Sequence, residues 1–269
     1  MAAVTRGAAR TVGPVQSDGP AVRLPIPARS RAGLRPMRPG LVLAGALSLL
    51  YVLLCVAVVS GSPLVDLDTA VLRWSPSTRW PWPHGFLSEW VLLGQRAVCL
   101  VLAAAWLGVR ALRTRDLRPL LTLGLVTLLL NASVGLVKTV TGRLGPTQLG
   151  PAAVHQGAST VFTSGTIFPS GHAANAIVTW GLLAWLAPRF RRAWGVAAGL
   201  LAGSIGLTTI YLGTHWVSDV LAGWAAGGLV LMAVPVLTPL VHRLARGADA
   251  VVTWVRGGVG LARPARMRP

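Results

Sequence analysis

The sequence predicts an all-α integral membrane protein, a bundle of six helices that cross a bilayer. Of its 269 residues, 53% are hydrophobic and only 12% are charged, whereas about a quarter of the residues in a soluble domain are charged. The apolar residues gather in runs near the roughly 20 residues that a bilayer core requires. Most basic residues fall between those runs, in segments that belong to one side of the predicted membrane.

Six segments are predicted to span the membrane. Four of them, 41–65, 119–137, 193–214 and 220–241, contain no charged residue. Segment 86–109 is apolar apart from Glu89 and Arg96, and segment 173–188 is short but extends back through His172. Each segment is close to the length of a transmembrane helix.

The basic residues predict the orientation. Seven lie in 1–40, four in 110–118, three in 189–192 and six after residue 241, out of 25 in the chain. The positive-inside rule places these segments in the cytoplasm, so both termini are predicted to be cytoplasmic and the protein to lie in the plasma membrane. The net charge of +18 then mainly reflects topology. A nucleic-acid partner is not expected, because no folded basic domain exists to bind one.

Three regions follow from this layout. Residues 1–40 form a basic head, expected to be disordered and cytoplasmic. Residues 41–241 form the six-helix domain. Residues 242–269 form a basic cytoplasmic tail, either disordered or bound to anionic lipid. The head and the first apolar run are too long for a signal peptide, so an uncleaved first helix is expected. Cys55 and Cys99 lie in apolar runs and are interpreted as small hydrophobic residues.

Polar residues gather where three predicted spans meet the outer side. Lys138, the only lysine in the chain, ends the third span. A compact ammonium suits a phosphate oxygen, although a helix-end cation also snorkels to the interface. The turn 169–172, Pro-Ser-Gly-His, leads into the fourth span, with Ser170 as its predicted N-cap. The free backbone N–H groups there favour an anion, and Gly171 allows close approach.

The sixth span is preceded by His215 and Asp219. Their i, i+4 spacing puts both on one helix face, so the carboxylate can hold the imidazole in one tautomer and stabilise its cation. A His–Asp hydrogen bond that only fixes the helix is the structural alternative. A zinc site built with His172 is a further alternative, but no pair with ligand spacing is present. No metal or cofactor is therefore predicted.

Together these residues resemble the type-2 phosphatidic acid phosphatase family of membrane lipid phosphatases, in the superfamily of the vanadium haloperoxidases. Its motifs are Lys-x6-Arg-Pro, Pro-Ser-Gly-His and Ser-Arg-x5-His-x3-Asp. The second motif is complete here, the third keeps its His and Asp, and the first keeps Lys138 and Pro146. The resemblance covers residues 41–240 and implies the six-helix core of that family.

Two family arginines that contact phosphate are missing. Gly145 stands before Pro146 where the family has arginine, and Thr209 stands at the arginine of the third motif. Arg143 is expected to reach the phosphate in place of the first. Arg96 is a candidate for the second, but an ion pair with Glu89 two turns away is the preferred interpretation.

The resemblance implies a metal-independent, cofactor-free phosphatase of the acid phosphatase type. His215 would attack phosphorus, Asp219 would orient it, and His172 would act first as general acid and then as base. The phosphate would be bound by Lys138, Arg143, Ser170 and Gly171. The implied substrate is a lipid phosphate or an isoprenoid (di)phosphate at the outer face. Two alternatives stay open: a phosphotransferase whose acceptor binds at the loop 147–168, and a degenerate lipid-binding protein without activity.

Overall fold

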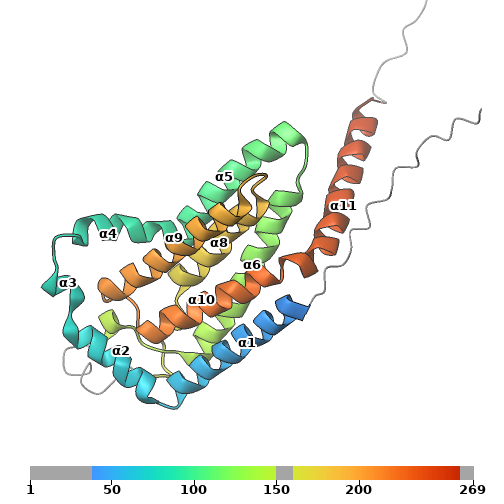
Figure 1. Ribbon diagram of the computed structural model, residues 1–269. Coiled ribbons are helices and arrows are strands. Elements are labelled where there is room, and N and C mark those ends of the chain that lie inside the picture. The colour runs from blue at the N-terminus through green and yellow to red at the C-terminus, as the bar shows by residue number, and fades with distance from the viewer. Residues whose placement is uncertain (1–37, 150–159, 261–269) are drawn as a thin grey trace, which may run out of the picture. The chain divides into compact units, whose positions relative to one another are not determined.

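The computed structural model describes residues 38–149 and 160–260, and every regular element within them is a helix (Figure 1). Most of the predicted head 1–40, the centre of the loop 147–168 and the end of the tail lie outside the described residues. The longer helices are α1 (Arg38–Val59), α5 (Arg96–Thr114), α6 (Arg118–Thr141), α8 (Gly171–Leu186), α9 (Arg191–Tyr211), α10 (Val217–Met232) and α11 (Val234–Gly260).

Five of the six predicted spans each correspond to one of these helices, whereas the sixth, 220–241, covers most of α10 and the beginning of α11. A count of six spans is not confirmed. Four helices, α1, α5, α6 and α9, are long and apolar enough to cross a membrane. The pair α10 and α11 qualifies only as one span bent by 50°. Helix α8 has 16 residues, which makes it shorter than a typical span.

Two predicted boundaries are wrong for a local reason. The first span was expected to reach residue 65, but α1 ends at Val59 and α2 (Pro63–Trp74) begins after a turn, with Ser62 as its N-cap. The second span was expected to start at residue 86, but the long helix in this region, α5, begins only at Arg96. Residues 84–94 form α4 (His84–Trp90) and the 3-10 turn η1 (Val91–Gly94), and Gln95 is extended.

The tail was predicted to be either disordered or bound to anionic lipid, and most of it belongs to a helix. Helix α11 runs through residue 260, and its apolar beginning packs against α6. The part of 242–269 that the structure describes is thus helical rather than disordered. Residues 261–269 lie outside the described part of the chain.

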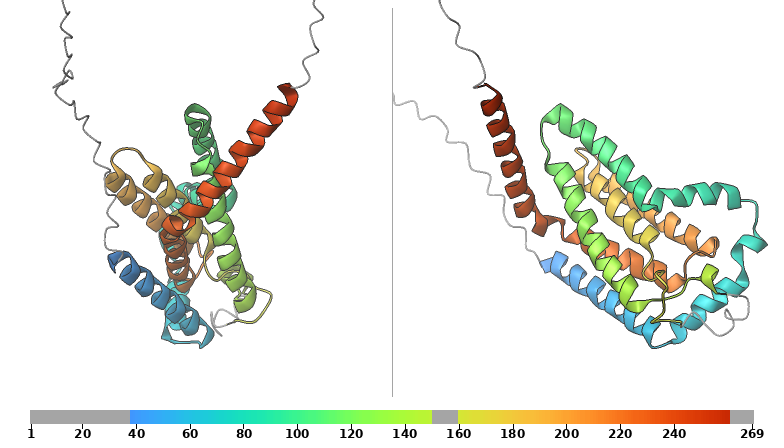
Figure 2. Two further views of the ribbon diagram at one scale, coloured as in Figure 1. Left: turned by 90° about the vertical axis from the view of Figure 1, so that its right-hand side faces the viewer. Right: turned by 180° about the vertical axis from the view of Figure 1, so that it is seen from behind.

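Helix α8 is the centre of the bundle, with α5, α6, α9 and α10 packed around it (Figure 2). Its contact with α10 depends on two glycines. A Cβ at Gly223 would lie 2.5 Å from the Ser170 carbonyl oxygen, and one at Gly227 would lie 2.8 Å from that of Ala174. Small residues allow helix backbones to approach closely in membranes. This close contact brings the beginnings of α8 and α10, and hence the second and third motifs, together.

Helix α2 packs against α10 at the end of the bundle where α10 begins, α3 (Pro76–Arg79) follows α2, and α6 ends there as well (Figure 1). Helix α6 is terminated by Gly142, whose φ of 52° is left-handed. Any side chain there would also collide with the Thr163 backbone. The chain therefore turns sharply after Thr141. Residues 160–168 then return beside this turn, where the Leu144 N–H donates to Thr160 and the Ile167 N–H donates to Arg143.

Candidate active site

The two histidines face each other at this end of the bundle. His172 is the second residue of α8, and His215 comes two residues before α10. Their ring centroids lie 5.8 Å apart in an edge-to-face arrangement, with 71° between the ring planes. His215 is 7% exposed. Two imidazoles at this separation can act on the same small group, one from each side.

Asp219 holds His215 in place, as the i, i+4 spacing predicts. The Nδ1 atom of His215 lies 3.4 Å from Oδ2 of Asp219, and the Trp216 N–H donates to the same oxygen at 3.0 Å. Because Nδ1 faces the carboxylate, Nε2 is the nitrogen left to react. The carboxyl group of Asp219 is fully buried.

Lys138 approaches from α6. Its Nζ donates to the carbonyl oxygens of Thr166 at 2.6 Å and Ile167 at 3.3 Å. These carbonyls belong to the segment that leads into the Pro-Ser-Gly-His turn, so the ammonium is held beside that turn. Its Cε would lie 4.0 Å from a Cβ at Gly171, the residue before His172. A held cation next to two imidazoles is suited to an anion.

Ser170 caps α8 as predicted. Its Oγ accepts from the Ala173 N–H at 3.4 Å, and its own N–H donates to the Asp219 carbonyl at 2.8 Å. Ser170 is fully buried. At Gly171, a Cβ would meet nothing nearer than Cε of Lys138 at 4.0 Å. The space in front of the turn is therefore open on the side of Lys138.

The prediction for Arg143 is wrong in its geometry. The guanidinium is 0% exposed and is surrounded by carboxylates rather than directed at open space. Its Nη1 donates to Oδ1 of Asp219 at 2.6 Å and to Oγ of Ser218 at 2.7 Å, and its Nη2 donates to Oδ2 of Asp68 at 2.7 Å. Arg143 thus positions the carboxylate that holds His215. We assign it this positioning role in place of the predicted phosphate contact.

Asp68 was missed by sequence reasoning. It lies on α2, is 1% exposed, and accepts from the backbone N–H of Ser218 at 2.9 Å and from the Ser218 hydroxyl. Burial raises the pKa of the Asp68 carboxyl, whereas the Arg143 guanidinium and the Ser218 donors oppose that shift. The available signal was rarity: the chain has only seven acidic residues, and two of them directly follow the first apolar run.

The charges of this cluster do not balance. One guanidinium pairs with two carboxylates, Asp68 and Asp219, at side chains that are 0% exposed. With both carboxylates ionised, one negative charge is left over in a region of low dielectric constant.

Positions 145 and 209, where the family has arginine, are closely packed in this structure. A Cβ added at Gly145 would lie 3.0 Å from Cγ1 of Ile167, so a long side chain at position 145 would displace Ile167. Thr209 is fully buried, and its carbonyl accepts from the backbone N–H of His215 at 3.3 Å. Position 209 therefore supports the His215 turn instead of supplying a cation.

The preferred ion pair between Arg96 and Glu89 is absent from the described part of the chain. The physical reason is the turn η1 and the extended Gln95, which put the two residues on separate helices. The predicted i, i+7 relation on one helix face does not exist. Both residues are exposed.

Across residues 38–149 and 160–260, no group of three or more His, Cys, Asp or Glu side chains is arranged to hold a metal ion. The zinc alternative has no supporting geometry there. Independence from metal stays a prediction.

The fold and the site together define the class of protein. The PAP2 superfamily model matches residues 119–243, which contain α6, α8, α9, α10 and the candidate site residues Lys138, His172, His215 and Asp219. The resemblance found in the motifs is confirmed over this segment.

Two particular relatives come from Bacillus subtilis. Phosphatidylglycerophosphatase B of strain 168 is 32% identical over 84 residues, 29% of this chain and 41% of the relative. The chain thus aligns with less than half of that protein. The crystal structure of a transmembrane PAP2-type phosphatidylglycerolphosphate phosphatase superimposes with a TM-score of 0.54 at 23% identity, covering 71% of this chain and 94% of the other. This match confirms the predicted fold class, an all-helical membrane bundle of the PAP2 type.

Proposed function

We propose that the chain is a metal-independent phosphatase that removes phosphate from a phosphorylated lipid through a phosphohistidine intermediate. One observation carries this proposal. His215 is backed by a buried carboxylate through Nδ1 and faces His172 across 5.8 Å between ring centroids. A nucleophile oriented by a third group, with an acid–base residue opposite, is the arrangement that nucleophilic catalysis requires.

In the first step, Nε2 of His215 attacks phosphorus and the bond from phosphorus to the leaving oxygen breaks. His172 donates a proton to that oxygen. The charge that grows on the equatorial oxygens meets the ammonium of Lys138 and the backbone N–H groups at the start of α8, beside Ser170 and Gly171. The surplus negative charge of the Asp68–Arg143–Asp219 cluster stabilises the cationic phosphohistidine.

In the second step, water attacks the phosphohistidine and His172 accepts its proton. The bond from phosphorus to Nε2 breaks, and inorganic phosphate leaves. His215 returns to its starting form, so no cofactor is consumed. Each proton in this sequence moves to or from His172, whose ring lies beside that of His215.

The substrate class follows from the membrane setting. The site lies at the ends of apolar helices, where the head group of a lipid meets water. The arginine distribution supports cytoplasmic termini, a plasma-membrane location and a site that faces outward. A cysteine introduced at exposed Thr78 on α3 is then expected to react with a membrane-impermeant thiol reagent added to intact cells. Labelling only after permeabilisation would reverse the orientation.

The direct test is phosphate release by the purified full chain from a lipid monophosphate and a lipid diphosphate, in detergent with excess chelator. We expect phosphate release from each of the two substrates, inhibition of this release by vanadate, and no release by His215→Ala. With a substrate that carries a radioactive phosphate, a protein-bound label that is lost in acid and retained in base would identify the phosphohistidine. Activity that needs added zinc would contradict the mechanism. Release that requires an added alcohol acceptor would favour the phosphotransferase.

A further inference from the structure

A groove along the second half of α8 takes no part in the proposed mechanism. It has a volume of about 400 Å³ and lies between α8, α9 and the end of α10. Volumes of roughly 300–1,000 Å³ are typical of pockets that hold small ligands. Its lining is mainly apolar, and no residue of the three motifs belongs to it. We call it the α8–α9–α10 groove, and it is separate from the two histidines near the beginnings of α8 and α10.

Glycines create the space of this groove. Gly195 and Gly199 are one turn apart on α9, both are exposed, and a Cβ at either position would meet nothing within 4 Å. Their i, i+4 spacing puts both on one helix face, so larger side chains there would fill the space. Leu231 of α10 packs against Gly181 of α8, where a Cβ would lie only 2.6 Å from Cδ2 of Leu231. The groove is therefore an open apolar surface between closely packed helices.

Two arginines line the groove at the beginning of α9. Arg191 and Arg192 are both exposed. Cζ of Arg191 lies 5.5 Å from the ring centroid of Trp185, which lines the groove from α8. Because an aromatic ring attracts a cation above its face, the Arg191 guanidinium is held at the groove. Neither arginine belongs to a salt bridge among the described residues, so no carboxylate there neutralises these two charges.

The surroundings of the groove add positive charge. Arg110 of α5 reaches the end of α8, where its Nη1 donates to the Leu186 carbonyl at 2.7 Å. The connections from α5 to α6 and from α8 to α9 therefore lie at one end of the bundle (Figure 1). Residues 110–118 and 189–192 hold seven basic residues and one acidic residue, Asp116, which forms a salt bridge within the first of these segments. The electrostatic potential at this end favours anions.

The occupant of the groove has to match both of its properties. The apolar surface favours a hydrocarbon chain, and the two guanidinium groups favour an anion, above all a phosphate, which each can bind with two hydrogen bonds. The chain's own segments 1–37 and 261–269 are basic and do not complement the arginines. A second copy in the same membrane orientation would bring the same basic segments to this end. An anionic phospholipid satisfies both requirements, since basic pockets between membrane helices bind anionic head groups.

We propose that the α8–α9–α10 groove binds an anionic phospholipid of the leaflet that meets this end of the bundle. One acyl chain lies along Gly195 and Gly199, and the phosphate is held by Arg191 and Arg192. The bound lipid fills the space between the three helices and stabilises their packing. This inference does not depend on the proposed function, because no residue of the candidate active site lines the groove.

The first test measures lipid binding to the purified full chain by native mass spectrometry, with phosphatidylglycerol and phosphatidylcholine that carry the same acyl chains. We expect phosphatidylglycerol to bind more tightly, because only its head group has a net negative charge. Arg191→Gln/Arg192→Gln is expected to lower its affinity about 10- to 30-fold. The matched control, Arg113→Gln/Arg115→Gln, removes two exposed arginines from the same end that do not line the groove. We expect a loss of less than about 3-fold for this control, because distant exposed charges are screened.

The second test blocks the groove and leaves its charges intact. Gly199→Leu puts a side chain where the acyl chain lies, so the affinity for phosphatidylglycerol is expected to fall about 10-fold. Gly195→Leu is a second variant of the same kind. The control is Gly108→Leu on α5, where a Cβ also meets nothing within 4 Å and which does not line the groove. Melting temperatures without added lipid detect any folding defect, and phosphatidylglycerol should raise that of the wild-type chain but not that of Arg191→Gln/Arg192→Gln.

Four outcomes would overturn the inference. Equal binding of the two lipids by the wild-type chain would show that the head-group charge is not recognised. Equal losses in the two arginine pairs would show that general surface charge attracts the lipid. Full binding by Gly199→Leu and Gly195→Leu would show that the acyl chain lies elsewhere. Loss of phosphatidylglycerol binding in Lys138→Ala, with full binding by Arg191→Gln/Arg192→Gln, would place the lipid at the candidate active site.

Discussion

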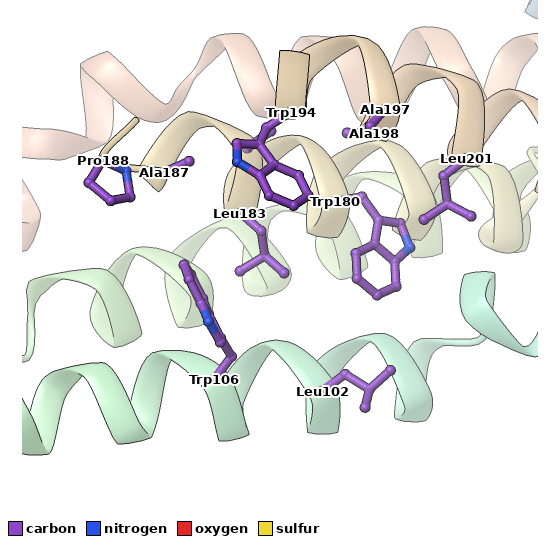
Figure 3. Close-up of a pocket in the computed structure, with 11 residues that line it drawn as sticks. Leu102, Trp106, Trp180, Leu183, Ala187, Pro188, Trp194, Ala197, Ala198 and Leu201 are labelled. Atoms are coloured by element: carbon purple, nitrogen blue, oxygen red, sulfur yellow. The ribbon is translucent and has the colours of Figure 1, made fainter. Parts of the chain in front are cut away.

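The two ends of α8 differ in how they use space. At its beginning, the Ser170 N–H donates to the Asp219 carbonyl of α10, beside the buried hydrogen bonds and ion pairs that join Asp68 of α2, Arg143 and α10. Toward its other end, a cavity of about 650 Å³ opens between α5, α8 and α9 (Figure 3). Trp106, Trp180 and Trp194 project from those three helices around this cavity, and its lining includes no ionisable side chain.

This difference shows where chemistry is possible in the molecule. The largest apolar hollow is often the first choice for an active site, but groups that must move protons need partners that fix their charge and orientation. The apolar cavity has room without such partners. The polar end has two imidazoles that face each other and a buried charge cluster. The comparison therefore supports the proposal that catalysis takes place at the polar end.

The largest expected effect comes from removing the central cation of that cluster. Arg143→Ala leaves the carboxylates of Asp68 and Asp219 buried without their shared partner. Breaking a buried ion pair in this way costs about 3–5 kcal/mol of stability. We expect a large fall in the detergent melting temperature and loss of phosphate release. A variant with unchanged melting temperature would show that the cluster is not the support we describe.

The next largest effect is expected at Lys138. Lys138→Ala removes an ammonium that faces developing charge, so kcat/KM is expected to fall about 100- to 1000-fold. The melting temperature should change little, because Nζ bonds only two loop carbonyls. Ser133→Ala, on the same helix, is the matched control, because its hydroxyl bonds only carbonyls of its own helix. A loss confined to stability would make Lys138 a purely structural residue.

The sequence predicted the parts of this site that depend on local patterns. The length of apolar runs located the helices, the cap pattern located Ser170, and the i, i+4 spacing paired His215 with Asp219. Contacts between distant segments were missed: Asp68 and Arg143 are 75 positions apart, and no local signal joins them. Arg143 was misassigned because a guanidinium suits a phosphate and a carboxylate equally well.

A local break also misled the sequence analysis. Glu89 and Arg96 share a face only if the helix is continuous, and the η1 turn interrupts it. Gly94 is the residue that the packing of this turn requires, because a side chain there would meet Ile205 and His172. A single glycine in an apolar run is weak evidence of a break, so a continuous span was the natural expectation.

A moderate effect is expected at Gly171, where the polar end has its open space. The methyl group of Gly171→Ala would meet nothing nearer than Cε of Lys138 at 4.0 Å, so folding should be unaffected. The methyl group would, however, occupy the place of the phosphate. We expect kcat/KM to fall about 10- to 100-fold at unchanged melting temperature. Gly124→Ala on α6, where a Cβ also meets nothing, is the control.

The smallest effect is expected in the apolar cavity, and it is the strictest test of the comparison. Ala198 lines this cavity from α9 and forms no part of the charge cluster at the polar end. Ala198→Leu adds apolar volume where hydrocarbon or detergent already contacts the protein, so little surface leaves water and stability should change by about 0.5 kcal/mol or less. No charge or hydrogen bond of the polar end is altered. We therefore expect kcat/KM within about 2-fold of wild type for both the lipid monophosphate and the lipid diphosphate. If Ala198→Leu instead lowers turnover 10-fold at unchanged melting temperature, the cavity takes part in binding the lipid chain, and the two ends of α8 serve one substrate.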